Sequence, residues 1–412
     1  MKVKYLFLLC MLAGITLYAP IAGAEEFFYK HEAGDKYRII STVHEDVYIN
    51  RVLNHRAEIL NRISVEVTDE SEGRGWHRAI FQTSERASAA GRTSGRQTSG
   101  VSQSFQLTRE YESEFERDRL GRLSIDVKYF MPVVRDVPVF PDRELHPGDR
   151  WVAEGHEMHD FRDSFGISEP YRIPFVAEYV FLGNREWKGK TYPAFSVSYR
   201  IRSEPQAVSG RLWPKRITGA SDQIVYWDSD MGQAVAYSEE FRMVLELSDG
   251  MTVEYRGRAE AEIVESHEMD KERIAEEINN DLRRLHIQDV TVRVVDEGIA
   301  ISLDDIQFHA DTAEMLPGEQ AKLDRIADIL LRYQDRDIQV SGHTALAGTA
   351  EGRLKLSYDR AAVVADYLLG KKVRTPDRII VRGYGAEKPR AGNDTEEGRR
   401  QNRRVEITIL EN

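Results

Sequence analysis

Hydrophobic and polar residues alternate along much of the chain between residues 37 and 265. The alternation is clearest in two segments, whose apolar positions are Ala57, Ile59, Ile63, Val65 and Val67 in the first and Val253, Tyr255, Ala259, Ala261 and Ile263 in the second. This period of two is typical of antiparallel strands that bury one face. Similar patterns predict further strands over residues 76–82, 105–114, 123–130, 174–181, 195–201, 223–227 and 233–247. We therefore expect roughly ten to twelve strands, arranged as a sandwich or as a large curved sheet.

A Pro-rich stretch interrupts this pattern between Met131 and Trp151. Proline cannot donate a hydrogen bond to a neighbouring strand, so the stretch predicts an irregular crossover within a soluble β domain. Strands that alternate in this way also occur in outer-membrane barrels, which remain an alternative for this region. The evenly spaced strands with aromatic ends that are typical of such barrels are not evident in the sequence.

The spacing of apolar residues changes after residue 265. An amphipathic helix is predicted between Met269 and Leu285, because its apolar residues recur every three or four positions. Two short strands follow over residues 290–303, and Leu323, Ile326, Leu330 and Leu331 form the apolar stripe of another helix. The remaining elements are predicted as strands over 338–341, 378–382 and 404–410 and a helix over 350–369. This mixture of strands and helices predicts a compact α/β sandwich.

The two patterns together predict an α+β multidomain protein, in which an antiparallel β-rich domain precedes an α/β sandwich. The predicted boundaries place a signal segment at residues 1–24, the β-rich domain at 25–266, a linker helix at 267–288 and the α/β domain at 289–412.

The first residues have the layout of a secretory signal. Lys2 and Lys4 precede an apolar run over residues 5–18, and small residues end the segment at Ala24. We expect cleavage near Ala24 and export of the chain. Lipoprotein processing at Cys10, which is the single cysteine of the chain, is an alternative. Cleavage near Ala24 would leave a chain without cysteine and hence without a disulfide or a thiolate metal site.

The chain is acidic, with a formal net charge of −12 that becomes −14 when the two lysines of the signal segment are removed. This sign disfavours nucleic acid or anionic lipid as the main partner. A basic segment between Arg86 and Arg109, rich in Ser, Gly and Thr, predicts a solvated loop. His156 and His159 would face opposite sides of a strand, so no metal site is predicted there. No phosphate-binding loop or nucleophile elbow is present, and we predict neither a cofactor nor an enzyme.

The last third of the chain carries an ordered series of short motifs. They are Val-Ser-Gly-His-Thr-Ala at 340–345, Leu-Ser-Tyr-Asp-Arg-Ala at 356–361, Gly-Tyr-Gly at 383–385 and Asn-Arg-Arg-Val-Glu-Ile at 402–407. From about residue 298 to 410, this series resembles the C-terminal domain of the OmpA-like family. The resemblance implies a domain that holds peptidoglycan noncovalently in the cell envelope, in the periplasm or on the periplasmic side of the outer membrane. The run from Asn402 to Glu406, together with Asn393 and Arg399, is expected to order the last loop and strand.

The resemblance also implies a binding site for the peptidoglycan stem peptide. Family members have an Asp after Gly-His-Thr, which pairs with the ammonium group of the diamino acid, but this chain has Ala345. The family Arg that binds a stem-peptide carboxylate is present as Arg360. The other expected site residues are Gly342, His343, Thr344, Arg353 and Leu356. We expect the backbone N–H groups near Ala345 and the hydroxyl of Thr344 to act as donors, and His343 to be a hydrogen-bonded loop residue.

The departures from the family pattern leave the ligand open. Loss of the Asp carboxylate should weaken ammonium recognition by about ten to a hundredfold unless another acid, such as Asp311 or Glu351, replaces it. Arg353 stands where the family often has Asn, and its charge would disfavour an ammonium group and attract carboxylates. The first hypothesis is therefore a wall-binding tether whose residues 25–266 face the outer membrane or a periplasmic protein. The alternatives are an interaction scaffold without wall binding and an outer-membrane barrel with a periplasmic anchor.

Overall fold

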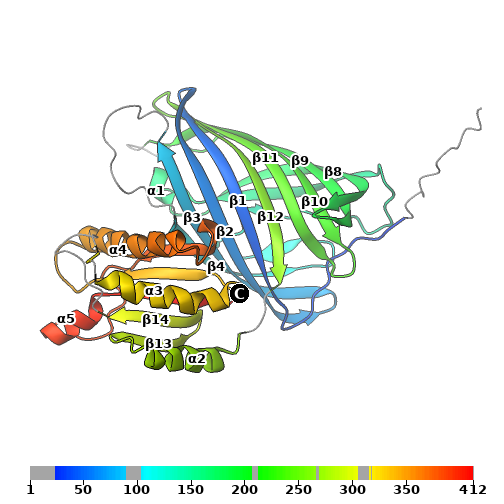
Figure 1. The fold of residues 1–412 in the computed structure, drawn as a ribbon. Helices are drawn as coiled ribbons and strands as arrows, with labels where there is room; N and C mark the ends of the chain where they lie inside the picture. The colour runs from blue at the N-terminus through cyan, green and yellow to red at the C-terminus, as the bar shows by residue number, and fades with distance from the viewer. Residues whose placement is uncertain are drawn as a thin grey trace, which may run out of the picture.

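The computed structural model describes residues 24–89, 104–206, 212–265, 269–304, 315–316 and 318–411. The predicted signal segment and the centre of the predicted basic loop, residues 90–103, lie outside these ranges. A β-rich part precedes a smaller part built of strands and helices (Figure 1). Among the described helices, none has the length and apolar character needed to cross a membrane.

Twelve strands form the described β-rich part. Their bounds are Lys36–Ile49 (β1), Val52–Ser71 (β2), Arg74–Ala89 (β3), Phe105–Arg117 (β4), Leu123–Ile125 (β5), Val134–Arg135 (β6), Arg150–His159 (β7), Tyr171–Trp187 (β8), Lys190–Ser203 (β9), Pro214–Asp228 (β10), Gln233–Leu247 (β11) and Thr252–Glu265 (β12). They pair antiparallel in the order β6 to β12 and then β1 to β5, because β12 pairs with β1. Of the two architectures left open by the sequence, the structure has the large curved sheet, which is open.

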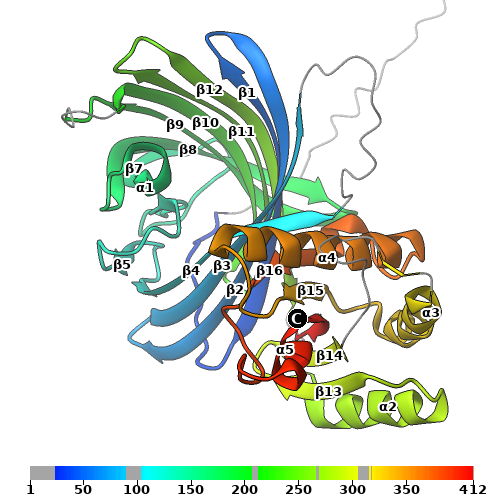
Figure 2. The same cartoon turned by 90° about the vertical axis from the view of Figure 1, so that its left-hand side faces the viewer.

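The sheet curves around the segment that joins β4 to β7. Figure 2 shows this segment, which includes β5, on the concave side, together with the short helix α1 (Arg162–Phe165) that follows β7. One end of the concavity is filled by an aromatic-rich cluster of Phe27, Tyr29, Phe140, Leu145, Phe181, Phe195 and Trp227. A second cluster around Phe175, Tyr179 and Tyr199 fills the region over β7 to β9. The Pro-rich crossover predicted from the sequence therefore lies inside the curve of the sheet.

Two sequence expectations differ from the observed strands. The strand predicted over 123–130 ends at Ile125, because Asp126 begins a turn in which its side chain accepts a hydrogen bond from the Lys128 amide at 2.9 Å. The long strand β1 was not singled out by alternation. Both of its faces carry buried or half-buried residues, since Arg38 and Val47 lie on opposite faces and are both buried. A strand covered on both sides loses the simple polar and apolar alternation.

The C-terminal part contains a five-stranded sheet in the order β13, β14, β17, β15 and β16. Its elements are α2 (Lys271–Arg284), β13 (Val290–Val295), β14 (Gly298–Asp304), α3 (Glu319–Leu330), η1 (Leu331–Tyr333), β15 (Ile338–His343), α4 (Ala350–Gly370), η2 (Pro376–Arg378), β16 (Ile379–Gly383), α5 (Glu396–Asn402) and β17 (Arg404–Leu410). These bounds agree with the predicted elements to within two residues for β15, α4, β16 and β17. The final strand β17 lies between β14 and β15, with both of which it is antiparallel.

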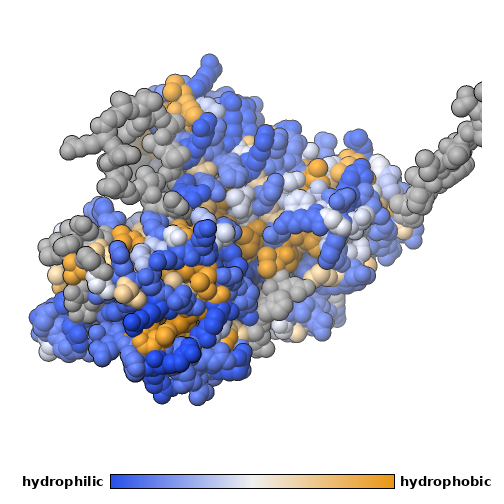
Figure 3. All heavy atoms as spheres, viewed as in Figure 1, coloured by the Kyte–Doolittle hydropathy of each residue, from blue (hydrophilic) through white to orange (hydrophobic). Residues whose placement is uncertain are grey.

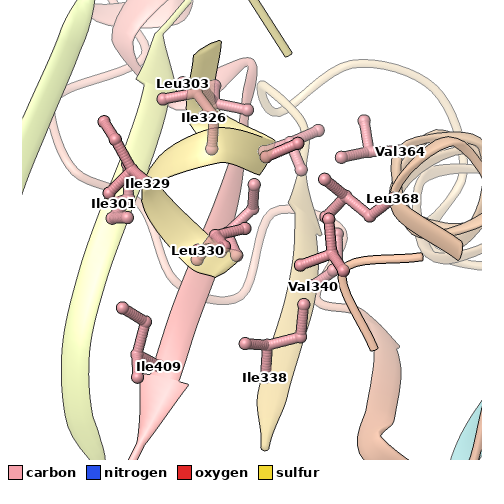
Figure 4. Packing of buried hydrophobic residues seen from close by; sticks show 14 of the residues in the cluster. Ile301, Leu303, Ile326, Ile329, Leu330, Ile338, Val340, Val364, Leu368 and Ile409 are labelled. Carbon is pink, nitrogen blue, oxygen red and sulfur yellow. The ribbon is translucent and has the colours of Figure 1, made fainter. Parts of the chain in front are cut away.

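One hydrophobic core holds the C-terminal part together. Figure 4 shows Ile326, Ile329 and Leu330 of α3 against the sheet, with Val364 and Leu368 of α4 beside them. The predicted linker helix α2 contributes Ile274, Ile278 and Leu282 to the same core. On the face drawn in Figure 3, hydrophilic residues cover most of the surface and hydrophobic residues are visible between α3 and α2.

The two parts are joined through the convex face of the large sheet. Strand β4 pairs in parallel with β16 at residues 105–106 and 380–381. The buried carboxylate of Asp337 lies 3.4 Å from the Arg38 guanidinium, 3.3 Å from that of Arg62 and 2.8 Å from that of Arg378. The first two cations belong to the β-rich part. The contact is thus a buried ionic cluster next to a shared strand pair, and the division into separate domains stays a prediction.

Candidate functional site

Two glycines let helix α4 lie directly on the ends of two strands. Gly342 of β15 and Gly383 of β16 are paired in the parallel register. A Cβ atom at Gly342 would lie 1.9 Å from the carbonyl oxygen of Ser357, and one at Gly383 would lie 2.7 Å from that of Leu354. Any larger residue would therefore push α4 away from the sheet. This packing explains why the Gly-His-Thr and Gly-Tyr-Gly segments each begin with a glycine.

Hydrogen bonds tie the loop after β15 to its neighbours. The Thr344 amide donates to the Gly385 carbonyl at 2.8 Å, and the Leu346 amide donates to the Asn393 side chain at 3.0 Å. Ser357, which sequence reasoning did not single out, accepts a hydrogen bond from the Gly385 amide at 2.9 Å. The expectation that the loop amides serve a ligand is thus wrong for Thr344 and Leu346, because both have partners within the protein.

The side chains of this loop are largely buried. Thr344 and Ala345 are each 7% exposed, and the Thr344 hydroxyl has no hydrogen-bond partner among the described residues. A buried hydroxyl without a partner loses its hydration without compensation, which costs roughly 1 to 3 kcal/mol. A ligand that supplied a partner for Thr344 would recover part of this energy.

His343 is not a hydrogen-bonded loop residue as expected. It is the last residue of β15, is 2% exposed, and stacks on Tyr384 with 5.2 Å between ring centroids. Neither ring nitrogen has a hydrogen-bond partner among the described residues. Burial, assisted by the nearby guanidinium of Arg404, lowers the pKa of His343 to about 3. The ring is therefore neutral at physiological pH and serves as packing.

Helix α4 carries the remaining predicted site residues, Arg353, Leu356 and Arg360. All three are half-buried. Arg353 donates from a terminal nitrogen to the Gly348 carbonyl at 2.6 Å, whereas its buried Nε has no partner among the described residues. Arg360 interacts with the surrounding protein. The preceding residue, Asp359, is paired with Lys355 at 2.5 Å.

Of the two acids that could replace the missing family Asp, the structure describes only Glu351. Asp311 lies outside the described residues. Glu351 is exposed in the first turn of α4, close in sequence to Arg353. The loop residue Ala345 itself brings no charge to the site.

The last loop is ordered by an amide side chain, as the motif predicts. Asn402 is 1% exposed, and its Oδ1 accepts hydrogen bonds from the amides of Arg390 at 2.7 Å and Ala391 at 3.0 Å. Its Nδ2 donates to the Asn393 side chain at 3.1 Å. Because Asn393 also holds the Leu346 amide, Asn402 positions the loop after β15 through one intermediate residue.

The histidines of β7 have carboxylate partners and do not converge on one point. His156 lies 3.4 Å from Asp136, and His159 lies 2.8 Å from Glu157. Among the residues that the structure describes, no group of three or more His, Cys, Asp and Glu side chains could hold a metal ion.

Comparison with known proteins places the similarity in the same C-terminal region. Residues 307–403 match the OmpA family, whereas no family matches the N-terminal part. Peptidoglycan-binding protein ArfA of Mycobacterium tuberculosis is 39% identical over 104 residues, which cover 25% of this chain and 32% of that protein. Outer membrane protein A of Bordetella avium is 39% identical over 106 residues, covering 26% of this chain and 54% of that protein. The chain thus spans about a third to a half of these relatives.

Among solved structures, the cell wall anchor of the T6SS from Pseudomonas aeruginosa is similar to the same region. It is 31% identical with a TM-score of 0.29, and the match covers 35% of this chain and 100% of that chain.

Proposed function

Residues 307–403 of this chain belong to the OmpA family, and we propose that they bind peptidoglycan and tether the outer membrane or a periplasmic assembly to the wall. Relatives of this region include a peptidoglycan-binding protein and an outer membrane protein, which supports association with peptidoglycan in the cell envelope. The role is binding, and no catalytic step is invoked. The single observation that carries the proposal is the family match together with Arg360 at the motif position.

The proposed mechanism is reversible capture of a stem peptide by α4 and the loop after β15. The guanidinium of Arg360 would bind a stem-peptide carboxylate, since its planar fork matches the two oxygens. The Thr344 hydroxyl would accept one hydrogen bond from the ligand or donate one to it. Arg353 would add a second cation, and the site would then prefer a ligand with more carboxylates than ammonium groups.

A second candidate function is a periplasmic interaction scaffold whose OmpA domain has lost wall binding. Ala345 favours this alternative, because no carboxylate follows Gly-His-Thr to pair with an ammonium group. In either case the β-rich part, residues 25–266, would contact the outer membrane or a periplasmic protein.

Sedimentation with purified peptidoglycan tests the proposal. The chain from Glu25 onward is mixed with peptidoglycan, pelleted, and compared with its Arg360→Ala variant. The matched control is Arg283→Ala, an exposed arginine on α2, which lies on the opposite side of the C-terminal part from α4 (Figures 1 and 2). We expect the original chain and the control to pellet, and the Arg360→Ala variant to lose about ten to a hundredfold in affinity.

The Ala345→Asp variant separates the two candidate functions. If the unmodified chain binds and Ala345→Asp changes its preference among walls with different diamino acids, the site is a retuned wall-binding site. If the unmodified chain fails to pellet but Ala345→Asp pellets, the domain is a scaffold that has lost binding through this position. Equal pelleting of the unmodified chain and Arg360→Ala would refute the proposed role of Arg360.

A further inference from the structure

The concave side of the large sheet encloses a cavity of about 1180 Å³. This exceeds the roughly 300 to 1,000 Å³ of ordinary small-molecule pockets. The cavity is bordered by residues from the hydrophobic clusters of the β-rich part and does not involve the peptidoglycan site. Its lining is more apolar than polar, with aliphatic residues that include Ile39, Val43, Ile59, Ile63 and Ile263.

The space exists because small residues occupy the middle of a curved sheet. Where strands β12 and β1 pair, Ala259 faces Val43 and Ala261 faces Ser41, all on the concave face. The next position on β12 is Gly257, where a Cβ atom would lie 2.2 Å from the ring of Phe241. The ring of Phe241 therefore occupies the space above Gly257, whereas larger side chains at Ala259 and Ala261 would fill part of the concavity. The strand pattern thus predicts a buried face, but the sizes of its residues leave that face unfilled.

The side of the cavity opposite the sheet is also apolar. The crossover between β4 and β7 contributes Met131, Pro132, Val133, Val134, Val137 and Pro138 to the lining. Several aliphatic residues on both sides, including Val43 and Val134, remain half-buried. Each such side chain would bury more apolar surface if the cavity were occupied, which would contribute about 25 cal/mol per Å².

At one end of the cavity lies a cation that has no counter-ion in the described part of the chain. Arg117, near the end of β4, lines the cavity together with Tyr29, His31 and Tyr37. Its guanidinium lies 4.7 Å from the centre of the Tyr29 ring, and its Nε is buried without a hydrogen-bond partner. Among the described residues Arg117 forms no ion pair within 4.0 Å. A half-buried guanidinium that has no carboxylate partner favours the binding of an anionic group.

The polar groups at the other end are occupied by one another. Tyr199 donates to the Glu157 carboxylate at 2.9 Å, and Ser221 donates to that of Glu239 at 2.6 Å. Burial, with a smaller contribution from Glu85, raises the pKa of Glu45 to about 7, which indicates a poorly hydrated surrounding. A second anion would therefore be disfavoured at this end.

These features select among classes of ligand. The backbone groups of the central strands are paired within the sheet, so the concave face has few main-chain partners to offer a peptide. A buried peptide would leave many of its own N–H and C=O groups without hydrogen-bond partners, which disfavours its binding. A hydrocarbon chain has no such groups and needs only apolar contact.

We propose that the cavity binds a long-chain amphiphile with an anionic headgroup. Its hydrocarbon chain lies between the sheet and residues 131–138, and its headgroup pairs with Arg117. A fatty-acid carboxylate and a phospholipid phosphate share this chemistry. The inference is independent of wall binding, since none of the residues involved belongs to the OmpA region.

Fluorescence titration with cis-parinaric acid, a fluorescent long-chain fatty acid, tests the proposal on delipidated protein from Glu25 onward. We expect saturable binding. Displacement by palmitate alone would identify a fatty-acid site, and displacement by phosphatidylglycerol as well would extend it to phospholipids. Absence of saturable binding, or displacement by neither competitor, would overturn the proposal.

Two pairs of variants locate the ligand. Val43→Trp fills the cavity from its middle, whereas the control Ile80→Trp changes a residue that is 42% exposed on the opposite face of β3. We expect Val43→Trp to weaken probe binding at least about tenfold and Ile80→Trp to leave it unchanged. Val43→Phe serves the same purpose if the melting temperature of Val43→Trp shows that it is unfolded. Unchanged binding by a folded cavity variant would contradict the proposal.

The headgroup is tested at Arg117. Arg117→Gln should weaken binding of the anionic probe about tenfold but leave displacement by neutral hexadecanol unchanged. The control is Arg119→Gln, which alters an exposed arginine paired with Asp142. Equal loss for the acid and the alcohol would show that Arg117 supports the fold and does not bind the headgroup.

Discussion

Substitution of Asp337 should destabilise the junction between the two parts of the chain. Its carboxylate is buried among the guanidinium groups of Arg38, Arg62 and Arg378, of which the first two are also buried. Asp337→Asn keeps the shape of the side chain but leaves these cations without a counter-ion. Breaking a buried ion pair in this way costs about 3 to 5 kcal/mol. For a cooperative unit of about 400 residues, the unfolding entropy converts this loss to a fall of about 4 to 6 °C in Tm.

Differential scanning calorimetry of the chain from Glu25 onward measures this loss. The matched control is Asp335→Asn, because Asp335 has an exposed side chain that faces Arg336 at 3.3 Å, and exposed pairs contribute about 0 to 1 kcal/mol. If Asp337→Asn melts within 1 °C of the control, the cluster does not stabilise the junction and the reasoning is wrong. A single transition that splits into two in Asp337→Asn would show that the cluster couples two folding units.

The Asp337 carboxylate also predicts how the stability of the folded chain changes with pH. Burial alone would raise the pKa of Asp337, but the guanidinium groups of Arg62, Arg38 and Arg378 outweigh burial and hold the pKa below its ordinary value. A depressed pKa in the folded state contributes stability above the unfolded value of about 3.9, and this stability is lost as the pH falls through the folded value. The wild type should therefore lose more stability between pH 5 and pH 3 than Asp337→Asn does.

Two further predictions concern the C-terminal part. The pKa of His343 is lowered to about 3 in the folded chain, so below about pH 6.5 the unfolded chain binds a proton that the folded chain does not. The free energy of unfolding, measured by urea denaturation, should therefore fall by about 2 kcal/mol more in the wild type than in His343→Phe between pH 7.5 and pH 5. Equal losses would mean that the ring is protonated in the folded state. Gly342→Ala should cost about 3 kcal/mol in the same assay, since the added Cβ would meet the Ser357 carbonyl at 1.9 Å. The control Gly370→Ala, which has open space around its Cβ, should change stability by less than about 1 kcal/mol, and a comparable loss there would contradict the packing argument.

Local patterns predicted most of the elements in the C-terminal part. The helix α4 and the strands β15, β16 and β17 agree with the predicted ranges because each has a regular apolar period and a clear start or end signal, such as the Thr349 cap that accepts from the Gly352 amide. The motif series also identified which part of the chain belongs to the OmpA family. These features depend on residues close together in sequence.

The state of the candidate site could not be predicted in the same way. The sequence places His343 and Thr344 in a motif, but their burial depends on α4 and on the Gly383–Gly385 segment, which come from later in the chain. Likewise, whether the Leu346 amide is available to a ligand depends on Asn393, which lies 47 residues further on. Hydrogen bonds of this kind form only when the sheet brings distant loops together.

For the β-rich part, the sequence by itself determined that the residues form antiparallel strands with one apolar face, because side chains in a strand alternate between two faces. Only the tertiary structure decided how far the sheet curves, which face the Pro-rich crossover covers, and that small residues such as Ala259 and Ala261 leave a cavity there. It also decided that Arg38 and Arg62 meet Asp337 across nearly 300 positions of sequence. Such contacts follow from the summed twist and register of many strands, which no local pattern specifies.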